Sequence, residues 1–245
     1  MTENEILIKS KKRVQQHGEV FTPKKVVDAM VTLPGLDETI KLATTTVLEP
    51  AAGEGVFLTN ILARRLELLA LQFQDDIIRF ENYALLAIST LYGIELLEDN
   101  VKRCSINLYL TFHEFYTKFA AEQNSLPKEG VLESAKTMAS VNIVQGDFLK
   151  RTARDGSPIV FSEWAPLRIT KQTKHIRVLR TEYTLDEIYK QVTKKAGSIF
   201  VPPIEVKQLA LFENRVDEEL KPKRNKYVVA KITDVYKQEM EEIDT

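Results

Sequence analysis

A glycine-rich turn carries the residue types best suited to hold a ligand. The apolar residues Val47 and Leu48 precede Pro50, and Gly53 and Gly55 lead into an amphipathic helical pattern. Glycine has no Cβ atom and tolerates a positive φ, so a ligand can lie directly against the backbone of such a turn. The order of strand, tight turn and helix therefore predicts a binding loop at the end of a strand.

Three acidic residues follow predicted strands in the same way. Glu49 ends the strand before the glycine turn, Glu95 ends the apolar run 90–96, and Asp147 ends the run 141–148. Ligands of an open parallel sheet bind outside the carboxyl ends of its strands. Carboxylates at those ends suit a ligand that offers hydroxyl groups, an amine and an adenine amino group, and they would repel a phosphate.

Two common nucleotide fingerprints do not fit these residues. No Lys-Ser or Lys-Thr pair follows the glycines, which disfavours a nucleoside triphosphate site. Glu95 lies 46 positions beyond Glu49 (95 minus 49), whereas a dinucleotide fingerprint places its acidic residue about 20 residues on. The residues therefore favour a neutral or cationic adenosine-type ligand.

Alternating strands and helices must position this site. The predicted strands are residues 44–48, 90–96, 141–148, 159–164 and 176–183; the predicted helices begin at Thr22-Pro23 and also cover 57–71, 76–88, 99–119 and 184–192, the last with Thr184 as its cap. The polar stretch 120–140 is expected to be irregular. This alternation predicts parallel βαβ units, an α/β class with a mostly parallel sheet and helices on both faces. We divide the chain into an N-terminal helical segment (1–40), a ligand-binding core (41–165) and a C-terminal extension (166–245).

Composition narrows the class of protein. The 245 residues are 44% hydrophobic with a net charge of −1, so contact with DNA would need a local basic face. The single cysteine, Cys104, excludes an internal disulfide and is expected to be a buried structural thiol, and His17, His113 and His175 lack the spacing of metal ligands. No apolar run approaches the roughly 20 residues of a membrane span, and no signal-peptide core is present, so we expect a cytoplasmic protein without a membrane partner.

Four motifs, in this order, resemble the adenine-specific N6 DNA methyltransferases of restriction–modification systems. They are Gly18-Glu19-Val20-Phe21-Thr22-Pro23, the turn in residues 48–58, Tyr92-Gly93-Ile94-Glu95, and residues 142–149. The resemblance covers roughly residues 15–165. It implies a Rossmann-like S-adenosylmethionine-dependent methyltransferase fold with S-adenosyl-L-methionine as the cofactor.

The resemblance also implies a role for each motif. Phe21 of the Phe-Thr-Pro motif would pack against the cofactor, and Glu95 would accept hydrogen bonds from the ribose hydroxyls. Asp147 and Phe148 would meet the adenine. The cofactor-binding residues implied in this way are Phe21, Thr22, Pro23, Glu49, Pro50, Ala51, Gly53, Gly55, Glu95, Asp147 and Phe148, with Glu49 and the backbone from Ala51 to Gly55 holding the methionine end.

The chain departs from this family at the catalytic motif. The family carries Asn or Asp, then Pro-Pro and an aromatic residue, which bind the target amino group and stack on the flipped base. The nearest segment here, Val201-Pro202-Pro203-Ile204, keeps the prolines without either working side chain, and residues 162–166 have an acid and Trp164 in the wrong order. Trp164 is expected to be a packing residue. No catalytic residue is assigned, and the chain alone is expected to methylate poorly or not at all.

Three functions stay open at this stage. The chain is a component of an adenine N6-methyltransferase that needs a partner subunit, a non-catalytic methyltransferase-like regulator or decoy that binds DNA or a partner in restriction or phage defence, or a methyltransferase acting on RNA or small molecules. The Phe-Thr-Pro motif favours the DNA-modifying group. Basic residues that could neutralise DNA phosphates are Lys171, Lys174, Arg177, Arg180, Lys221, Lys223, Arg224 and Lys226.

Overall fold

The computed structural model describes residues 9–170, 173–202 and 224–243 of the chain. Its elements up to residue 153 are α1 (Lys11–His17), α2 (Lys24–Val31), α3 (Leu36–Ile40), β1 (Val47–Glu49), α4 (Val56–Gln72), α5 (Ile77–Ser89), β2 (Leu91–Glu95), α6 (Glu98–Glu122), α7 (Glu129–Val141), β3 (Ile143–Asp147) and β4 (Thr152–Ala153). These are followed by β5 (Val160–Pro166), β6 (Arg177–Thr184), α8 (Leu185–Tyr189), β7 (Arg224–Tyr227), β8 (Ala230–Lys231), the 3₁₀ helix η1 (Ile232–Lys237) and β9 (Met240–Ile243).

A sheet of four strands in the order β1-β2-β3-β4 lies at the centre of the fold. β1, β2 and β3 are parallel, with Glu49 opposite Gly93 and Glu95 opposite Gln145, and the short β4 runs antiparallel to β3. Each parallel pair is joined through helices that cross from the end of one strand to the start of the next. The α/β class with parallel strands predicted from the alternation of patterns is therefore confirmed.

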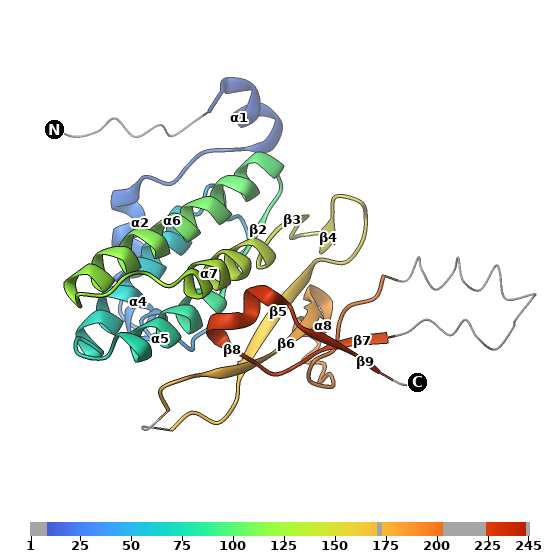
Figure 1. Cartoon of the computed structure of the whole chain (residues 1–245). Coiled ribbons are helices and arrows are strands. Elements are labelled where there is room, and N and C mark those ends of the chain that lie inside the picture. The colour runs from blue at the N-terminus through green and yellow to red at the C-terminus, as the bar shows by residue number, and fades with distance from the viewer. Residues whose placement is uncertain (1–8, 171–172, 203–223, 244–245) are drawn as a thin grey trace, which may run out of the picture.

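Helices α4, α5, α6 and α7 cover one face of this sheet (Figure 1). All five residues of β2 are buried. Because side chains alternate along a strand, Leu91 points into the core shared with the helices, while Tyr92 and Ile94 belong to a second cluster on the opposite face. Gly93 brings this strand close to α4, since a Cβ there would lie 3.2 Å from a methyl group of Leu58.

The opposite face is covered by the antiparallel hairpin β5–β6 and by Leu185 of α8. Helices were expected on both faces, but among the described elements the helical cover of this face is limited to α8, and strands form most of it. The reason lies in β5, whose residues alternate so that Phe161 packs edge-on against Tyr92, with ring centroids 5.3 Å apart. Asn142 fixes the hairpin by donating to the Ser162 carbonyl (3.0 Å) and accepting from the Ser162 amide (2.9 Å). The Asn142 side chain thus makes the same kind of paired hydrogen bonds to β5 that the backbone of a neighbouring strand would make.

The stretch 120–140 contains helix α7, so the expectation of an irregular segment there is wrong. Val131, Ala135 and Met138 follow at helical spacing and are buried against the helical core. The polar residues between them obscured this apolar periodicity in the sequence. The predicted helix after Thr184 is confirmed, because the Thr184 hydroxyl accepts from the Glu187 amide and the Glu187 carboxylate accepts from the Thr184 amide.

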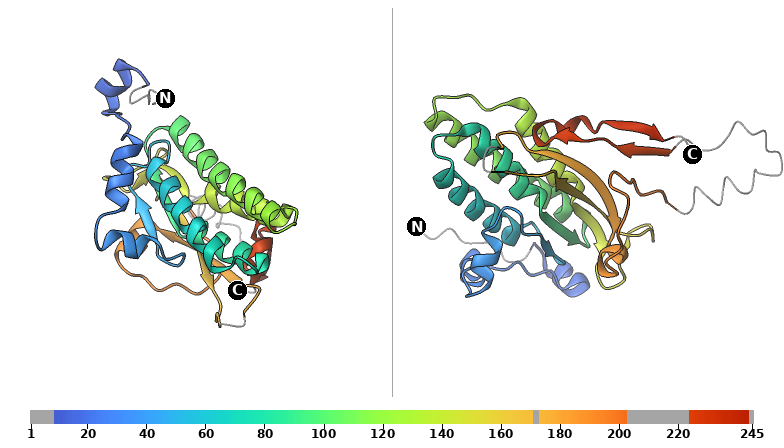
Figure 2. Two further views of the ribbon diagram at one scale, coloured as in Figure 1. Left: turned by 90° about the vertical axis from the view of Figure 1, so that its left-hand side faces the viewer. Right: turned by 90° about the horizontal axis from the view of Figure 1, so that it is seen from below.

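The C-terminal elements return to the helical side of the molecule. Figure 2 shows η1 beside α7, where a Cβ on Gly130 would lie only 2.9 Å from the carbonyl oxygen of Thr233. β8 pairs with β6, and β7 pairs with β9. The boundary expected at residue 165 falls inside β5, whose Ala165 pairs with Leu179 of β6.

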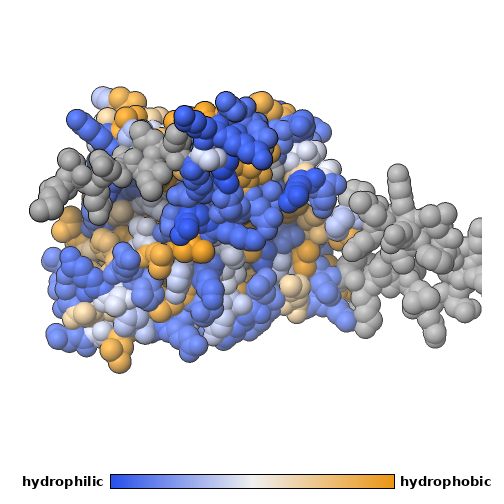
Figure 3. All heavy atoms as spheres, turned by 90° about the horizontal axis from the view of Figure 1, so that it is seen from above, coloured by the Kyte–Doolittle hydropathy of each residue, from blue (hydrophilic) through white to orange (hydrophobic). Residues whose placement is uncertain are grey.

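None of the described helices is long and apolar enough to cross a bilayer. Figure 3 shows the molecule from above relative to the view of Figure 1, and this face is mostly hydrophilic with scattered apolar side chains.

Candidate functional site

The glycine turn connects β1 to α4 at the carboxyl end of the parallel sheet. Gly53 and Gly55 both have positive φ, +54° and +87°, as predicted for a tight turn. The Ala52 amide donates to the carbonyl of Ile94 (2.9 Å), and the Gly55 amide donates to the carbonyl of Ala52 (2.8 Å). Asn107 of α6 donates to the carbonyl of Glu54 (2.9 Å). The turn is therefore held between β2 and α6.

Glu95 is the predicted acid that bonds to a glycine of this turn. Its Oε2 accepts from the Gly53 amide (2.9 Å), and its Oε1 accepts from the Leu97 amide (3.0 Å) and from Asn100 Nδ2 (3.4 Å). The residue is buried. A carboxylate has about four lone-pair positions, so these three bonds fix its orientation and leave capacity for one more donor.

The other two predicted acids lie on the same face of the sheet by strand register but make local contacts. Glu49 accepts from the Ala51 amide (3.3 Å), and burial raises the pKa of its carboxyl. Asp147 accepts from the Lys150 ammonium (3.0 Å) and the Leu149 amide (3.0 Å), and the Lys150 side chain lowers its pKa. Of the three, only Glu95 bonds to a glycine of the turn.

The Phe-Thr-Pro motif lies beside the turn. A Cβ on Gly53 would lie 3.7 Å from two ring carbons of Phe21, which is ordinary van der Waals contact. Pro23 rather than Thr22 is the N-cap of α2, and no side chain caps this helix. Phe148 packs instead into the apolar cluster on the hairpin side of the sheet.

Cys104 leaves no space for a side chain at Gly55. A Cβ on Gly55 would lie 2.6 Å from Cys104 Sγ, well inside contact distance. Cys104 is buried, as expected for a structural thiol, and burial together with the carboxylates of Glu95 and Glu49 raises its pKa to about 12. The thiol is therefore protonated at neutral pH and is unsuited to act as a nucleophile.

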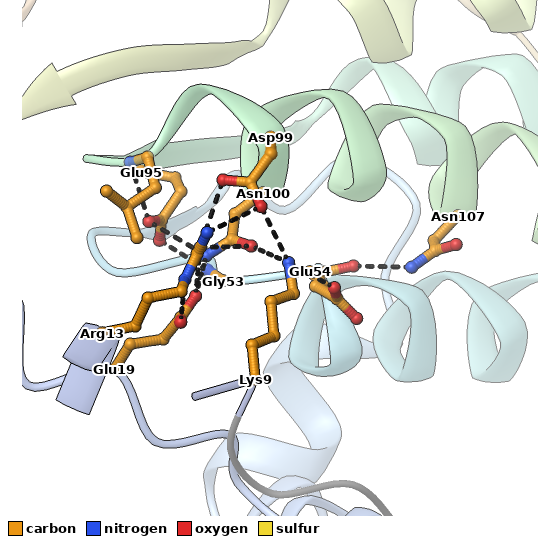
Figure 4. A network of polar contacts seen from close by, with 10 residues as sticks. Lys9, Arg13, Glu19, Gly53, Glu54, Glu95, Asp99, Asn100 and Asn107 are labelled. Atoms are coloured by element: carbon orange, nitrogen blue, oxygen red, sulfur yellow. Dashed lines mark hydrogen bonds and ion pairs between the residues drawn. The ribbon is translucent and has the colours of Figure 1, made fainter. Parts of the chain in front are cut away.

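Sequence analysis missed a network of charged residues over the turn (Figure 4). Lys9 and Arg13, from the N-terminal segment, form ion pairs with Glu54 and Asp99. Glu19 pairs with Arg13 and accepts from Asn100 Nδ2 (2.6 Å). The ion-pair partners are up to 90 residues apart, so no local pattern could have paired them. The one hint was the position of Glu19, two residues before Phe21 of the Phe-Thr-Pro motif.

Sequence analysis also missed a cavity of about 360 Å³ beside β1, on the hairpin side of the sheet. Aromatic and aliphatic side chains, among them Leu48, Tyr92, Phe161 and Tyr183, form much of its wall, and Glu163 and Glu187 are its charged residues. Its position separates it from the glycine turn, because Leu48 and Tyr92 point away from the helical face. It therefore does not contribute to the site built on Glu95.

Trp164 and two of the candidate DNA-binding cations, Arg180 and Lys226, are engaged in contacts within the structure. Trp164 is buried with its ring 5.1 Å from the Arg180 guanidinium, which confirms it as a packing residue. Arg180 is itself buried and bonded to Glu182 (3.0 Å), so it cannot meet phosphates. Lys226 is paired with Glu241 (2.7 Å). Positions 171, 203, 204, 221 and 223 lie outside the described residues.

No group of three or more His, Cys, Asp or Glu side chains in the described part of the chain is arranged to hold a metal ion. Comparisons with protein-family models, curated proteins and solved structures gave no match. The arrangement around Gly53 and Glu95 is thus the basis for any functional assignment.

Proposed function

We propose that the chain is the cofactor-binding part of an adenine-specific DNA N6-methyltransferase-like protein, with a Rossmann-like methyltransferase fold. S-adenosyl-L-methionine occupies the edge of the sheet at the glycine turn. The observation that carries this proposal is the hydrogen bond from the Gly53 amide to Glu95 Oε2. It joins a positive-φ glycine turn to an acidic strand end at the carboxyl edge of a parallel sheet, where such sheets bind nucleosides.

Electrostatics supports this ligand over phosphorylated nucleotides. Glu49, Glu95 and Asp147 end three neighbouring parallel strands. S-adenosylmethionine brings a sulfonium, an ammonium and two ribose hydroxyls to this edge, and each is attracted by a carboxylate or can donate a hydrogen bond to one. In this proposal the free acceptor position of Glu95 takes a ribose hydroxyl, and Phe21 covers the cofactor.

The chain in this proposal does not transfer the methyl group by itself. Transfer to adenine needs the base extruded from the duplex, its amino nitrogen bonded to an acceptor and its ring stacked. The sequence lacks the Asn/Asp-Pro-Pro-aromatic segment that supplies these groups. A partner subunit provides them, and DNA is the substrate of the assembled enzyme.

Calorimetric titration with S-adenosylmethionine and its demethylated product tests cofactor binding. We expect micromolar or weaker affinity for the native chain and a loss of at least about tenfold for Glu95→Gln, since a hydrogen bond to a charged group contributes about 1.5–3 kcal/mol. The matched control is Glu98→Gln, three positions from Glu95, which removes an exposed carboxylate that is paired with Lys102. Absence of heat with the folded native chain would refute the proposal.

A non-catalytic regulator or decoy is the second candidate, favoured by the missing catalytic segment. The two candidate functions are distinguished by measuring methyl incorporation at adenine N6 of mixed-sequence duplex DNA from labelled S-adenosylmethionine, with and without a candidate partner subunit. The methyltransferase component gains N6 incorporation with its partner and shows none alone. A regulator gains none with any partner, whereas robust incorporation by the chain alone would contradict both candidates.

A further inference from the structure

The N-terminal segment Lys9–Phe21 lies over the candidate cofactor site (Figure 4). The Phe21 ring is in contact distance of the Cβ position of Gly53, and the Lys9 ammonium lies 5.5 Å from the centroid of that ring. We call this segment the N-terminal arm. Lys9 and Arg13 of this arm project into the acidic rim formed by the glycine turn and the first turn of α6.

The Lys9 ammonium is fully coordinated by this rim. It lies 2.8 Å from Glu54 Oε1, 3.1 Å from Asp99 Oδ2 and 2.5 Å from Asn100 Oδ1. An ammonium group has three N–H donors, so each donor has one acceptor. Glu54 directly follows Gly53 in the turn, which places the ammonium at the entrance to the proposed cofactor site.

Arg13 and Asn100 connect the arm to the acid that holds the turn. The Arg13 guanidinium bonds to Asp99 (2.9 Å) and to Glu19. Asn100 is buried and its Nδ2 donates both to Glu19 (2.6 Å) and to Glu95 (3.4 Å). Contact with Arg13 lowers the pKa of Asp99 to about 2, so this carboxylate of the rim is charged at neutral pH. A single side chain, that of Asn100, therefore links Lys9 to Glu95, the carboxylate proposed to bind the ribose.

We propose that Glu54 and Asp99 form the subsite for the ammonium group of the cofactor and that Lys9 occupies it in the free protein, so that the N-terminal arm competes with the cofactor. This inference rests on the proposed function. The two cations are chemically equivalent, since each is a primary ammonium with three donors. Both groups would compete for the same carboxylate oxygens, and two ammonium charges held side by side repel each other, so the arm releases Glu54 and Asp99 when the cofactor binds.

The exposure of these ion pairs makes the arm releasable. The side chains of Lys9 and Glu54 are each 28% exposed and that of Asp99 is 53% exposed. Ion pairs with this access to solvent are weak and screened by salt. The arm therefore lowers the affinity for the cofactor without closing the site permanently.

The test compares Lys9→Ala with Lys12→Ala by calorimetric titration. Lys12 has the same charge, lies on the same arm and is exposed, and it forms no ion pair with the described residues. We expect Lys9→Ala to bind S-adenosylmethionine about three- to tenfold more tightly than the native chain, the range that one or two such pairs can account for. Methylthioadenosine lacks the ammonium, and its affinity should be the same for all three proteins. Lys12→Ala should match the native chain.

Hydrogen exchange of the amides in residues 10–20 gives a readout that does not depend on these affinities. We expect S-adenosylmethionine to accelerate exchange there in the native chain, while methylthioadenosine does not. Equal affinities of native and Lys9→Ala protein for S-adenosylmethionine, with unchanged exchange in the arm, would overturn the competition and leave the proposed function intact. Failure of every variant to bind S-adenosylmethionine would overturn both.

Discussion

Gly55 combines two requirements in one residue. Its φ of +87° belongs to the left-handed region, and the space where a side chain would begin is filled by Cys104 Sγ, 2.6 Å away. The first requirement follows from the turn and the second from the packing of α6. Glycine meets both because it lacks the Cβ atom.

Gly55→Ala should lower the free energy of unfolding by about 2–5 kcal/mol, from left-handed strain of about 1–2 kcal/mol and overpacking of about 1–3 kcal/mol. Urea unfolding measures this loss. Gly156→Ala is the matched control, because its φ is +83° and no atom lies within 4 Å of the added Cβ; it should show the strain alone. Cys104→Ala in the Gly55→Ala background should recover part of the difference. Equal losses for the two alanine variants would show that the contact with Cys104 has no cost.

At the residue scale the sequence predicted the site's backbone better than its side-chain contacts. The positive φ of Gly53 and Gly55 and the strand-end position of Glu95 follow from local patterns and are confirmed. The hydrogen bond from the Gly53 amide to Glu95 joins residues 42 positions apart and depends on how β1 and β2 are aligned. The cations of the N-terminal arm were beyond prediction because ion pairs between distant residues leave no periodic pattern.

Among the elements, α4 carries an unusual anchor in Arg65. This side chain is fully buried, yet no carboxylate is among its hydrogen-bond partners in the described structure. It donates to the carbonyls of Ile40 (2.6 Å), Thr45 (2.7 Å) and Ala87 (3.0 Å) and to the Thr90 hydroxyl (2.9 Å). Ile40 and Ala87 lie at the carboxyl ends of α3 and α5, whose dipoles attract a cation. Burial lowers the pKa of Arg65 to about 10, still well above neutrality.

Arg65→Met should therefore destabilise the fold by about 3 kcal/mol or more, since each buried acceptor left without a donor costs about 1–3 kcal/mol. The comparison is Arg64→Met, which removes a partly exposed arginine that donates to Asn60 from the neighbouring position. We expect a change below about 1 kcal/mol there. Denaturant unfolding of both variants, monitored by circular dichroism, measures the two losses of stability. A larger loss for Arg65→Met shows that its buried hydrogen bonds, and not the removal of an arginine from α4, cause the destabilisation.

Most elements were visible in the sequence because their apolar residues repeat at a clear period. Helix α4 was predicted at residues 57–71 and spans Val56–Gln72, and the cap of α8 was identified at Thr184. Helix α7 was missed because polar residues separate its buried positions. The two strands of the hairpin were also predicted, but a strand pattern does not say which surface the strand will cover.

The whole molecule has one main apolar core to which the C-terminal third contributes. Trp164, Ile176, Val178, Ile232 and Val235 belong to the same cluster as the helices α4–α7. The Ile176 amide also donates to the buried Asn82 of α5 (2.7 Å). The extension after residue 165 is therefore part of the packed structure.

A chain that ends at Ala165 should lose cooperative unfolding, because it removes β6 from β5 and four of those five core residues. Thermal unfolding followed by near-ultraviolet circular dichroism measures this. A chain that ends at Ile243 keeps every described element and should unfold like the native protein. A cooperative transition in the shorter chain would show that residues 1–165 form an independent domain.

The position of β1 at the border of the parallel sheet also bears on self-association. Among the described strands it pairs only with β2, and an exposed strand edge is a template on which other copies can add. Its three residues form a short template, and Pro50, which follows at once, has no amide hydrogen to donate. The same proline that starts the glycine turn therefore also limits aggregation through this border.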